Sequence, residues 1–426
     1  MAMSESGEGT VLDAAGELLR ADGLADVGLM DVVELDGGGL GLVTALRAEH
    51  VELEALDAAR PAVGARVRRR GRLEVPAGDG LLGRTIDALG RPRDGGGAID
   101  ADASAPLFPR APSVLPASRA RRFTLGLLAS DLMLAPRAGA SLLTVGGAPF
   151  LLDTIARHQL AAGRRVILAQ PAGPRAVHQP PASLTVTGAG ATSAGRWLVP
   201  WAAMAIGEAL RARGYEVVVL VDGLHFWLRL AARFPHHGAP ITQAGRLAAR
   251  AWAGPDGSVT LVATSAGPTV RARGDCVDLV VDLDRAQRGL LPDLGTKRAR
   301  PPIDVRGKAR LGRLVTLLAQ LEELDRRDPF AELGPELTQA RRAQAALQPR
   351  AGDPVDSVEQ LALLLAVLAL EALPPSQIPR FVERFLARLR DDHAALLDEV
   401  RARRLIDEPD EALLRDAALA LEATLG

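Results

Sequence analysis

Strand-like and helix-like segments alternate through the middle of this chain, from residue 123 to about residue 303. Almost continuously apolar segments such as EVVVLVDG and SVTLVATS are separated by helical patterns such as WAAMAIGEALRARG. Strands that are apolar on both faces and alternate with helices are typical of a parallel sheet that helices cover on both sides. We therefore expect residues 123–306 to form an α/β domain.

The regions on either side of this domain have different sequence patterns. Residues 27–98 contain short β-rich segments punctuated by glycine, which predict a β-barrel after an N-terminal extension over residues 1–26. Residues 99–122 contain four prolines and predict an extended linker. Residues 307–426 are helical almost throughout and predict a C-terminal bundle. The chain is thus expected to be multidomain.

Composition excludes several classes of function. The formal net charge of -1 gives no overall field that would attract nucleic acid. Cys276 is the only cysteine, which excludes an internal disulfide and a cysteine-cluster metal site and fits a reducing cytosol. The apolar run at 361–370 is too short to span a bilayer, and the N-terminus shows no secretory signal, so direct membrane insertion is not expected. His236 and His237 lie between prolines and glycine, where an exposed turn is expected.

The junction at residues 141–155 reads SLLTVGGAPFLLDTI, an apolar strand, a glycine pair and then a helix. A phosphate-binding loop at such a junction needs Gly, four spacers and Gly-Lys-Ser/Thr, so that backbone N–H groups, an ammonium and a hydroxyl surround the phosphates. Here Gly146 and Gly147 are followed by no lysine, and no hydroxyl side chain comes before Thr154. Pro149 also removes a backbone donor. A tight strand-to-helix turn is expected instead.

Three collinear blocks resemble F-type rotary ATPase subunits. GDGLLGRTIDALGRPRDGGG at 78–97 is similar to the end of the barrel domain in alpha and beta subunits, and residues 198–224 are similar to the segment that leads into the Walker B strand. The tail, at 317–324, 346–366 and 378–390, resembles the alpha subunit, and in particular its alternative, sodium-type branch. The resemblance implies a β-barrel, a RecA-like, P-loop NTPase-like α/β domain and a C-terminal helical bundle.

The chain departs from this family where nucleotide would bind. The deletion after Gly146 removes the P-loop lysine and threonine, and Asp222 is followed by Gly223 where the family has two acidic residues. The glutamine that alpha subunits place near bound nucleotide is replaced at 265–267. Gly146, Gly147 and Asp222 are therefore vestigial positions, and Asp222 could hold a magnesium-bound water or cap the following helix. We expect no nucleotide-binding residue, no metal site and no cofactor, with ATP and Mg²⁺ bound only if the degenerate site keeps residual affinity.

The segment 289–303 occupies the place from which alpha subunits send an arginine finger into the neighbouring catalytic site. Matching Asp293 to the pattern of the alternative branch assigns the finger to Arg300, whereas counting back without gaps from LLAQLEEL assigns it to Lys297. We choose Arg300 because a guanidinium fits phosphate oxygens better than an ammonium does. Lys297 and Arg298 remain alternatives, and a basic loop facing solvent is the other interpretation.

The resemblance implies a non-catalytic alpha-like subunit of an ATP synthase or ion-translocating ATPase, and not an ATPase by itself. Its partners would be catalytic beta subunits in an alternating hetero-hexameric ring and a gamma-like central-stalk subunit, with peripheral-stalk subunits as further candidates. The location would be cytoplasmic and peripheral to the cell membrane, in a complex that translocates protons or sodium. The alternative is a detached alpha paralogue that regulates or docks on a hexameric ATPase.

Overall fold

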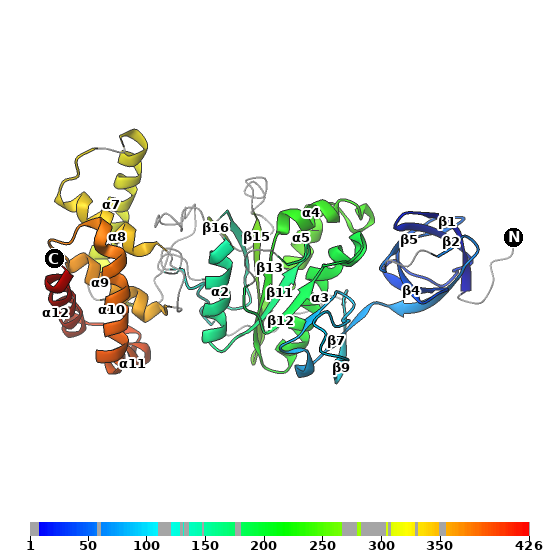
Figure 1. The fold of residues 1–426 in the computed structure, drawn as a ribbon, viewed down its shortest axis with the longest axis horizontal. Coiled ribbons are helices and arrows are strands. Elements are labelled where there is room, and N and C mark those ends of the chain that lie inside the picture. The colour runs from blue at the N-terminus through cyan, green and yellow to red at the C-terminus, as the bar shows by residue number, and fades with distance from the viewer. Residues whose placement is uncertain are drawn as a thin grey trace. The chain divides into compact units, whose positions relative to one another are not determined.

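The structure is a computed structural model of the chain (Figure 1). It describes residues 8–57, 61–109, 121–127, 131, 136–146, 149–174, 180–265, 279–282, 304–305, 308–328, 331–348 and 355–425. Contacts divide the chain into two compact units. The first comprises residues 1–120, 138–144 and 163–280, and the second comprises residues 121–137, 145–162 and 281–426.

Six antiparallel strands in the first unit close into a barrel, in the order β1-β2-β5-β4-β3-β6. They are β1 (Glu8–Ala15), β2 (Leu18–Asp22), β3 (Asp31–Leu35), β4 (Gly39–Leu46), β5 (Val51–Ala55) and β6 (Arg66–Arg72). In β6, Val67 is buried in the barrel core, whereas Arg68, Arg69 and Arg70 are exposed. Gly41 allows close packing, because a Cβ there would lie 3.1 Å from Cγ2 of Val33.

The barrel boundaries differ from those expected from the sequence. Strand β1 pairs with both β2 and β6, so the predicted extension at 1–26 supplies two strands that close the barrel. The predicted barrel end at residue 98 is also wrong, because β8 (Thr85–Ile86) pairs with a strand of the central sheet. The predicted linker at 99–122 contains β9 (Ala103–Pro106), which pairs with β7 (Glu74–Ala77). A two-residue strand carries too little pattern to be recognised in a sequence.

The central sheet has the order β16-β10-β15-β13-β11-β12-β8, with β14 paired beside β15. Its further strands are β10 (Ser141–Val145), β11 (Arg165–Gln170), β12 (Leu184–Thr187), β13 (Glu216–Val221), β14 (Trp252–Ala253), β15 (Ser258–Ser265) and β16 (Leu279–Asp282). Strands β8, β12, β11, β13 and β15 run parallel. The valines of β13 are fully buried, as both faces of a covered sheet require. The predicted α/β domain is confirmed.

Helix α3 (Ser193–Ala212) packs against β11 and β13 in the first unit, beside α4 (Leu224–Ala231) and α5 (Pro240–Ala248) (Figure 1). The helix begins after Thr192, whose Oγ1 accepts a hydrogen bond from the backbone N of Gly195 at 3.2 Å. A Cβ at Gly207 would lie 3.2 Å from Cγ2 of Val219. This glycine therefore lets the helix approach the sheet closely.

The C-terminal part of the second unit is a helical bundle, as predicted. It contains α7 (Lys308–Arg327), α8 (Pro335–Leu347), α9 (Ser357–Ala369), α10 (Ile378–Asp392), α11 (Ala394–Arg403) and α12 (Glu408–Leu425). Helix α9 starts with a capping box between Asp356 and Glu359. Phe381 and Phe385 stack in the bundle core, with their ring centroids 5.4 Å apart. Within the described residues, no helix combines the length and apolarity needed to cross a membrane.

Candidate functional site

The parallel strands β11, β13 and β15 end at one edge of the sheet, which is where ligands bind in open α/β folds. Asp222 follows β13 at this edge and is only 5% exposed. Its Oδ1 accepts a hydrogen bond from the Thr264 hydroxyl at 3.4 Å, and that hydroxyl accepts one from the backbone N of Gly223 at 3.0 Å. Gly223 is the N-cap residue of α4 and has a φ of 87°, in the left-handed region that glycine adopts without strain.

Two further polar side chains end the neighbouring strands. Gln170, the last residue of β11, is 1% exposed, and Ser265, the last residue of β15, is 2% exposed. Among the residues that the structure describes, neither the Gln170 amide nor the Ser265 hydroxyl has a hydrogen-bond partner. This edge of the sheet therefore carries the Gln170 amide, the Thr264 and Ser265 hydroxyls and the Asp222 carboxylate. In the part of the chain that the structure describes, no three His, Cys, Asp or Glu side chains gather to hold a metal.

Gly146 directly follows β10 and has a φ of 74°, in the left-handed region that glycine adopts without strain. Helix α2 (Pro149–Ala161) begins shortly afterwards, so residues 146–148 alone connect the strand to the helix. A phosphate-binding loop with its lysine and hydroxyl spans eight residues and does not fit into this connection. Gly147 lies outside the described residues.

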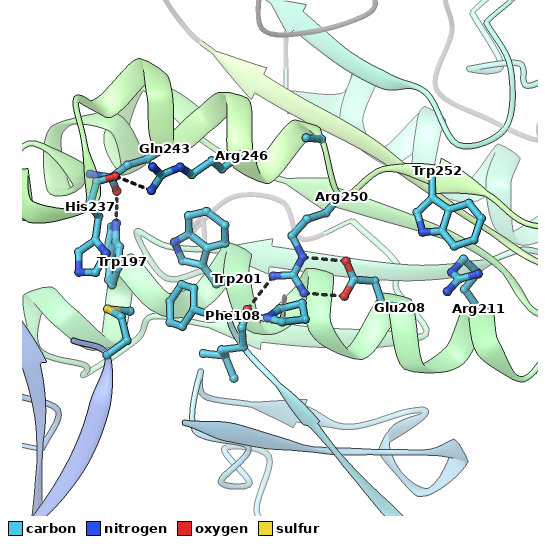
Figure 2. Close-up of a pocket in the computed structure, with 14 residues that line it drawn as sticks. Phe108, Trp197, Trp201, Glu208, Arg211, His237, Gln243, Arg246, Arg250 and Trp252 are labelled. Atoms are coloured by element: carbon cyan, nitrogen blue, oxygen red, sulfur yellow. Dashed lines mark hydrogen bonds and ion pairs between the residues drawn. The ribbon is translucent and has the colours of Figure 1, made fainter. Parts of the chain in front are cut away.

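A cavity of about 670 Å³ lies elsewhere in the first unit (Figure 2). It is lined by residues of α3 and α5, residues 107–109 after β9, and Met30, His237 and Trp252. His237 was expected in an exposed turn, but it is half-buried, and burial together with Arg246 lowers its pKa to about 4. Sequence reasoning missed this cavity, although Trp197 and Trp201 are spaced four residues apart, which places both on one helix face.

Comparison with known proteins gives a consistent result. No family model matches the chain. It is 28% identical to "ATP synthase subunit alpha 3" of Paraburkholderia xenovorans (strain LB400), over 97% of this chain and 88% of that protein. It is 26% identical to "ATP synthase subunit alpha" of Lactobacillus delbrueckii subsp. bulgaricus, over 96% of this chain and 92% of that protein. The chain is similar to ATP synthase alpha subunits over nearly its full length.

The fold agrees with this relationship, because a β-barrel, a RecA-like α/β domain and a helical bundle follow one another as expected for an alpha subunit. The alignment of this chain with the Paraburkholderia protein runs over 475 residues, whereas the chain has 426. The relative therefore has positions for which this chain has no residue.

The segment expected to carry an arginine finger lies outside the described residues. The assignment of Arg300 and its alternatives Lys297 and Arg298 therefore stays a prediction. Of the residues singled out around the expected nucleotide site, Gly146 and Asp222 are ones whose surroundings the structure describes.

Proposed function

We propose that this protein is a non-catalytic, alpha-like subunit of an F-type ATP synthase or ATPase, and that it alternates with catalytic beta subunits in a ring around a gamma-like stalk subunit. The proposal is supported by relatives named as alpha subunits over nearly the full chain and by the three-part fold. The observation that carries its non-catalytic character is the short connection of residues 146–148 between β10 and α2.

The residues around this connection do not fit a magnesium-bound nucleoside triphosphate. A phosphate cradle needs successive backbone N–H donors and a lysine, but the connection has no lysine and is followed by Pro149, which has no N–H. Asp222 is the single carboxylate after β13, and its Oδ1 is 3.4 Å from the Thr264 hydroxyl. We therefore propose that the chain has lost nucleotide binding, and we assign no step of ATP hydrolysis to it.

The remaining role is to build the ring and to complete the catalytic site of a neighbour. Phosphoryl transfer is catalysed by positioning and by neutralising charge on the transferring group, and one cation supplied by an adjacent subunit contributes much of that neutralisation. We propose that the segment around Arg300 supplies this cation. The protein would then lie in the cytoplasm as a peripheral part of a membrane-attached complex.

Co-expression with the beta and gamma subunits of the same organism tests this role. A tagged copy of the chain should purify with beta subunits in equal amounts, and the complex should hydrolyse ATP while the tagged chain alone does not. Expression of the same tagged chain without beta subunits is the control for self-association. If the tagged chain elutes alone, without beta subunits, the chain is a detached paralogue.

A further inference from the structure

The cavity in Figure 2 is elongated along helix α3, and we call it the α3 groove. Helix α3 contributes four residues to its lining, Trp197, Trp201, Glu208 and Arg211. Their spacing along the sequence places all four on one face of the helix. At a rise of about 1.5 Å per residue, the helix advances roughly 20 Å from Trp197 to Arg211. The groove is therefore long enough for an extended ligand.

The middle of the α3 groove is aromatic and is fixed before any ligand arrives. Phe108 and Trp201 lie there, with their ring centroids 5.3 Å apart. Beside them, Arg250 engages both oxygens of Glu208 at 2.7 Å and donates to the backbone oxygen of Leu107 at 2.8 Å. The arginine and the glutamate neutralise each other, so the middle of the groove carries no net charge and favours apolar groups.

Each end of the α3 groove carries a cation that has no ion pair among the described residues (Figure 2). At one end, the Arg211 guanidinium lies 4.0 Å from the centroid of the Trp252 ring. At the other end, the exposed Arg246 donates from Nη1 to the backbone oxygen of His237 at 3.0 Å. Burial and Arg246 lower the pKa of His237 to about 4, so His237 adds no charge near pH 7. The two ends therefore favour two separate anionic groups.

Two buried donors of the lining also lack acceptors. Among the residues that the structure describes, the Nε1 of Trp201 and the Nε of Arg211 have no hydrogen-bond partner. A buried indole N–H normally finds an acceptor. An extended peptide has a backbone carbonyl on every residue, so it would bring acceptors to the middle of the groove as well as side chains to its ends. A hydrocarbon chain would bring none.

From the length of the α3 groove, its apolar middle and its terminal cations, we infer that it binds an extended segment of a partner protein. This segment carries two acidic side chains about six residues apart, with apolar side chains between them. An extended chain advances about 3.3 Å per residue, so six residues cover roughly 20 Å. Because side chains alternate, the first, third, fifth and seventh residues of the segment would face the groove.

The charge of the groove does not match the neighbouring part of this chain. Residues 110–120 follow the lining residue Pro109 in sequence, but they include Arg110 and Arg119 and no acidic residue. An acidic segment of another protein is therefore the better match. The α3 groove is separate from the sheet edge at Asp222, and the inference does not depend on the proposed role in a ring.

Titration calorimetry of the full chain with the end-blocked peptide Glu-Ser-Leu-Ser-Leu-Ser-Glu tests this site. The peptide should bind with a dissociation constant of about 100 μM or tighter. With both glutamates replaced by glutamine, it should bind roughly tenfold more weakly, because neither end then supplies a charge. The rearranged peptide Glu-Glu-Ser-Leu-Ser-Leu-Ser should bind about threefold more weakly, because its glutamates reach only one arginine.

Arginine variants identify the two ends. Arg211→Met should weaken the glutamate peptide about tenfold and leave the glutamine peptide unchanged, since methionine keeps an apolar stem over Trp252. Arg246→Met should weaken the glutamate peptide about threefold, because an exposed ion pair contributes less. Arg229→Met is the matched control, because the exposed Arg229 also lies near an aromatic ring, 5.9 Å from that of Phe226, but does not line the groove.

Four outcomes would overturn the proposal. They are equal affinity for the glutamate and glutamine peptides, no binding of the glutamate peptide at millimolar concentration, equal affinity for the rearranged peptide, and Arg211→Met and Arg246→Met variants that behave like the control. A peptide with the sequence of residues 110–120 is a further comparison. Tighter binding of this peptide than of the glutamate peptide would also contradict the proposal, because the groove would then select a segment of its own chain.

Discussion

Replacing Arg300 with alanine is expected to leave the complex assembled and to lower its ATP turnover by roughly 10³- to 10⁵-fold, which is what an arginine finger supplied by a neighbouring subunit contributes. The guanidinium would meet charge that develops on the transferring phosphoryl group, so the loss should appear in kcat. Steady-state hydrolysis by the co-purified complex measures the effect, and size-exclusion chromatography confirms that the ring is intact.

Parallel variants decide which residue is the finger. Lys297→Ala and Arg298→Ala are matched controls, because each removes one cation from the same segment. If Lys297→Ala alone abolishes turnover, the ungapped alignment is correct and the assignment of Arg300 is wrong. If none of the three changes turnover, the subunit contributes only architecture at that interface.

Asp131→Ala should destabilise the second unit by about 3 kcal/mol or more, because each buried N–H that loses its acceptor costs about 1–3 kcal/mol. The Asp131 carboxylate is 1% exposed. It accepts hydrogen bonds from the backbone N of Leu125 at 2.7 Å, of Gly126 at 2.7 Å and of Leu127 at 3.0 Å. Hydrogen exchange of these three amides in the full chain should accelerate roughly a hundredfold.

Asp391→Ala is the control for this variant, since Asp391 is exposed near the end of α10. The pH dependence is a second check. Burial raises the pKa of Asp131 from 3.8 to about 6, so the folded unit holds this proton more tightly than the unfolded chain. Its contribution to stability is present below about pH 4 and is lost as the pH rises through 6. Wild-type protection at the three amides should therefore increase from pH 7 to pH 5 relative to Asp131→Asn, and identical profiles would contradict this assignment.

The larger divisions of the fold were predictable because each has its own hydrophobic pattern. Apolar strands such as β13 identify a covered parallel sheet, and the long helical tail identifies the bundle. Strands β1 and β2 were missed because their alternating polar residues resemble an extension, and only pairing between distant residues closes the barrel. Strand β8 could not be recognised, since pairing with β12 depends on tertiary structure.

Some features of the candidate site could likewise be predicted from the sequence, and others could not. The absence of a P-loop follows directly from the letters after Gly146, and the left-handed φ of that glycine agrees with the expected turn. The contact of Asp222 with Thr264 joins two strands distant in sequence and could not be foreseen. The same is true of the cavity, where the spacing of Trp197 and Trp201 was a signal but Trp252 comes from another strand.

The central claim is that this chain keeps the architecture of an alpha subunit and has lost its nucleotide site. Titration calorimetry of the purified chain with Mg-ATP and Mg-ADP tests it most directly, with an alpha subunit that has an intact phosphate loop as the positive control. We predict no binding heat for this chain up to millimolar nucleotide, because the residues that follow Gly146 include no lysine and Pro149 lacks a backbone N–H donor. A dissociation constant in the micromolar range for either nucleotide would contradict the claim.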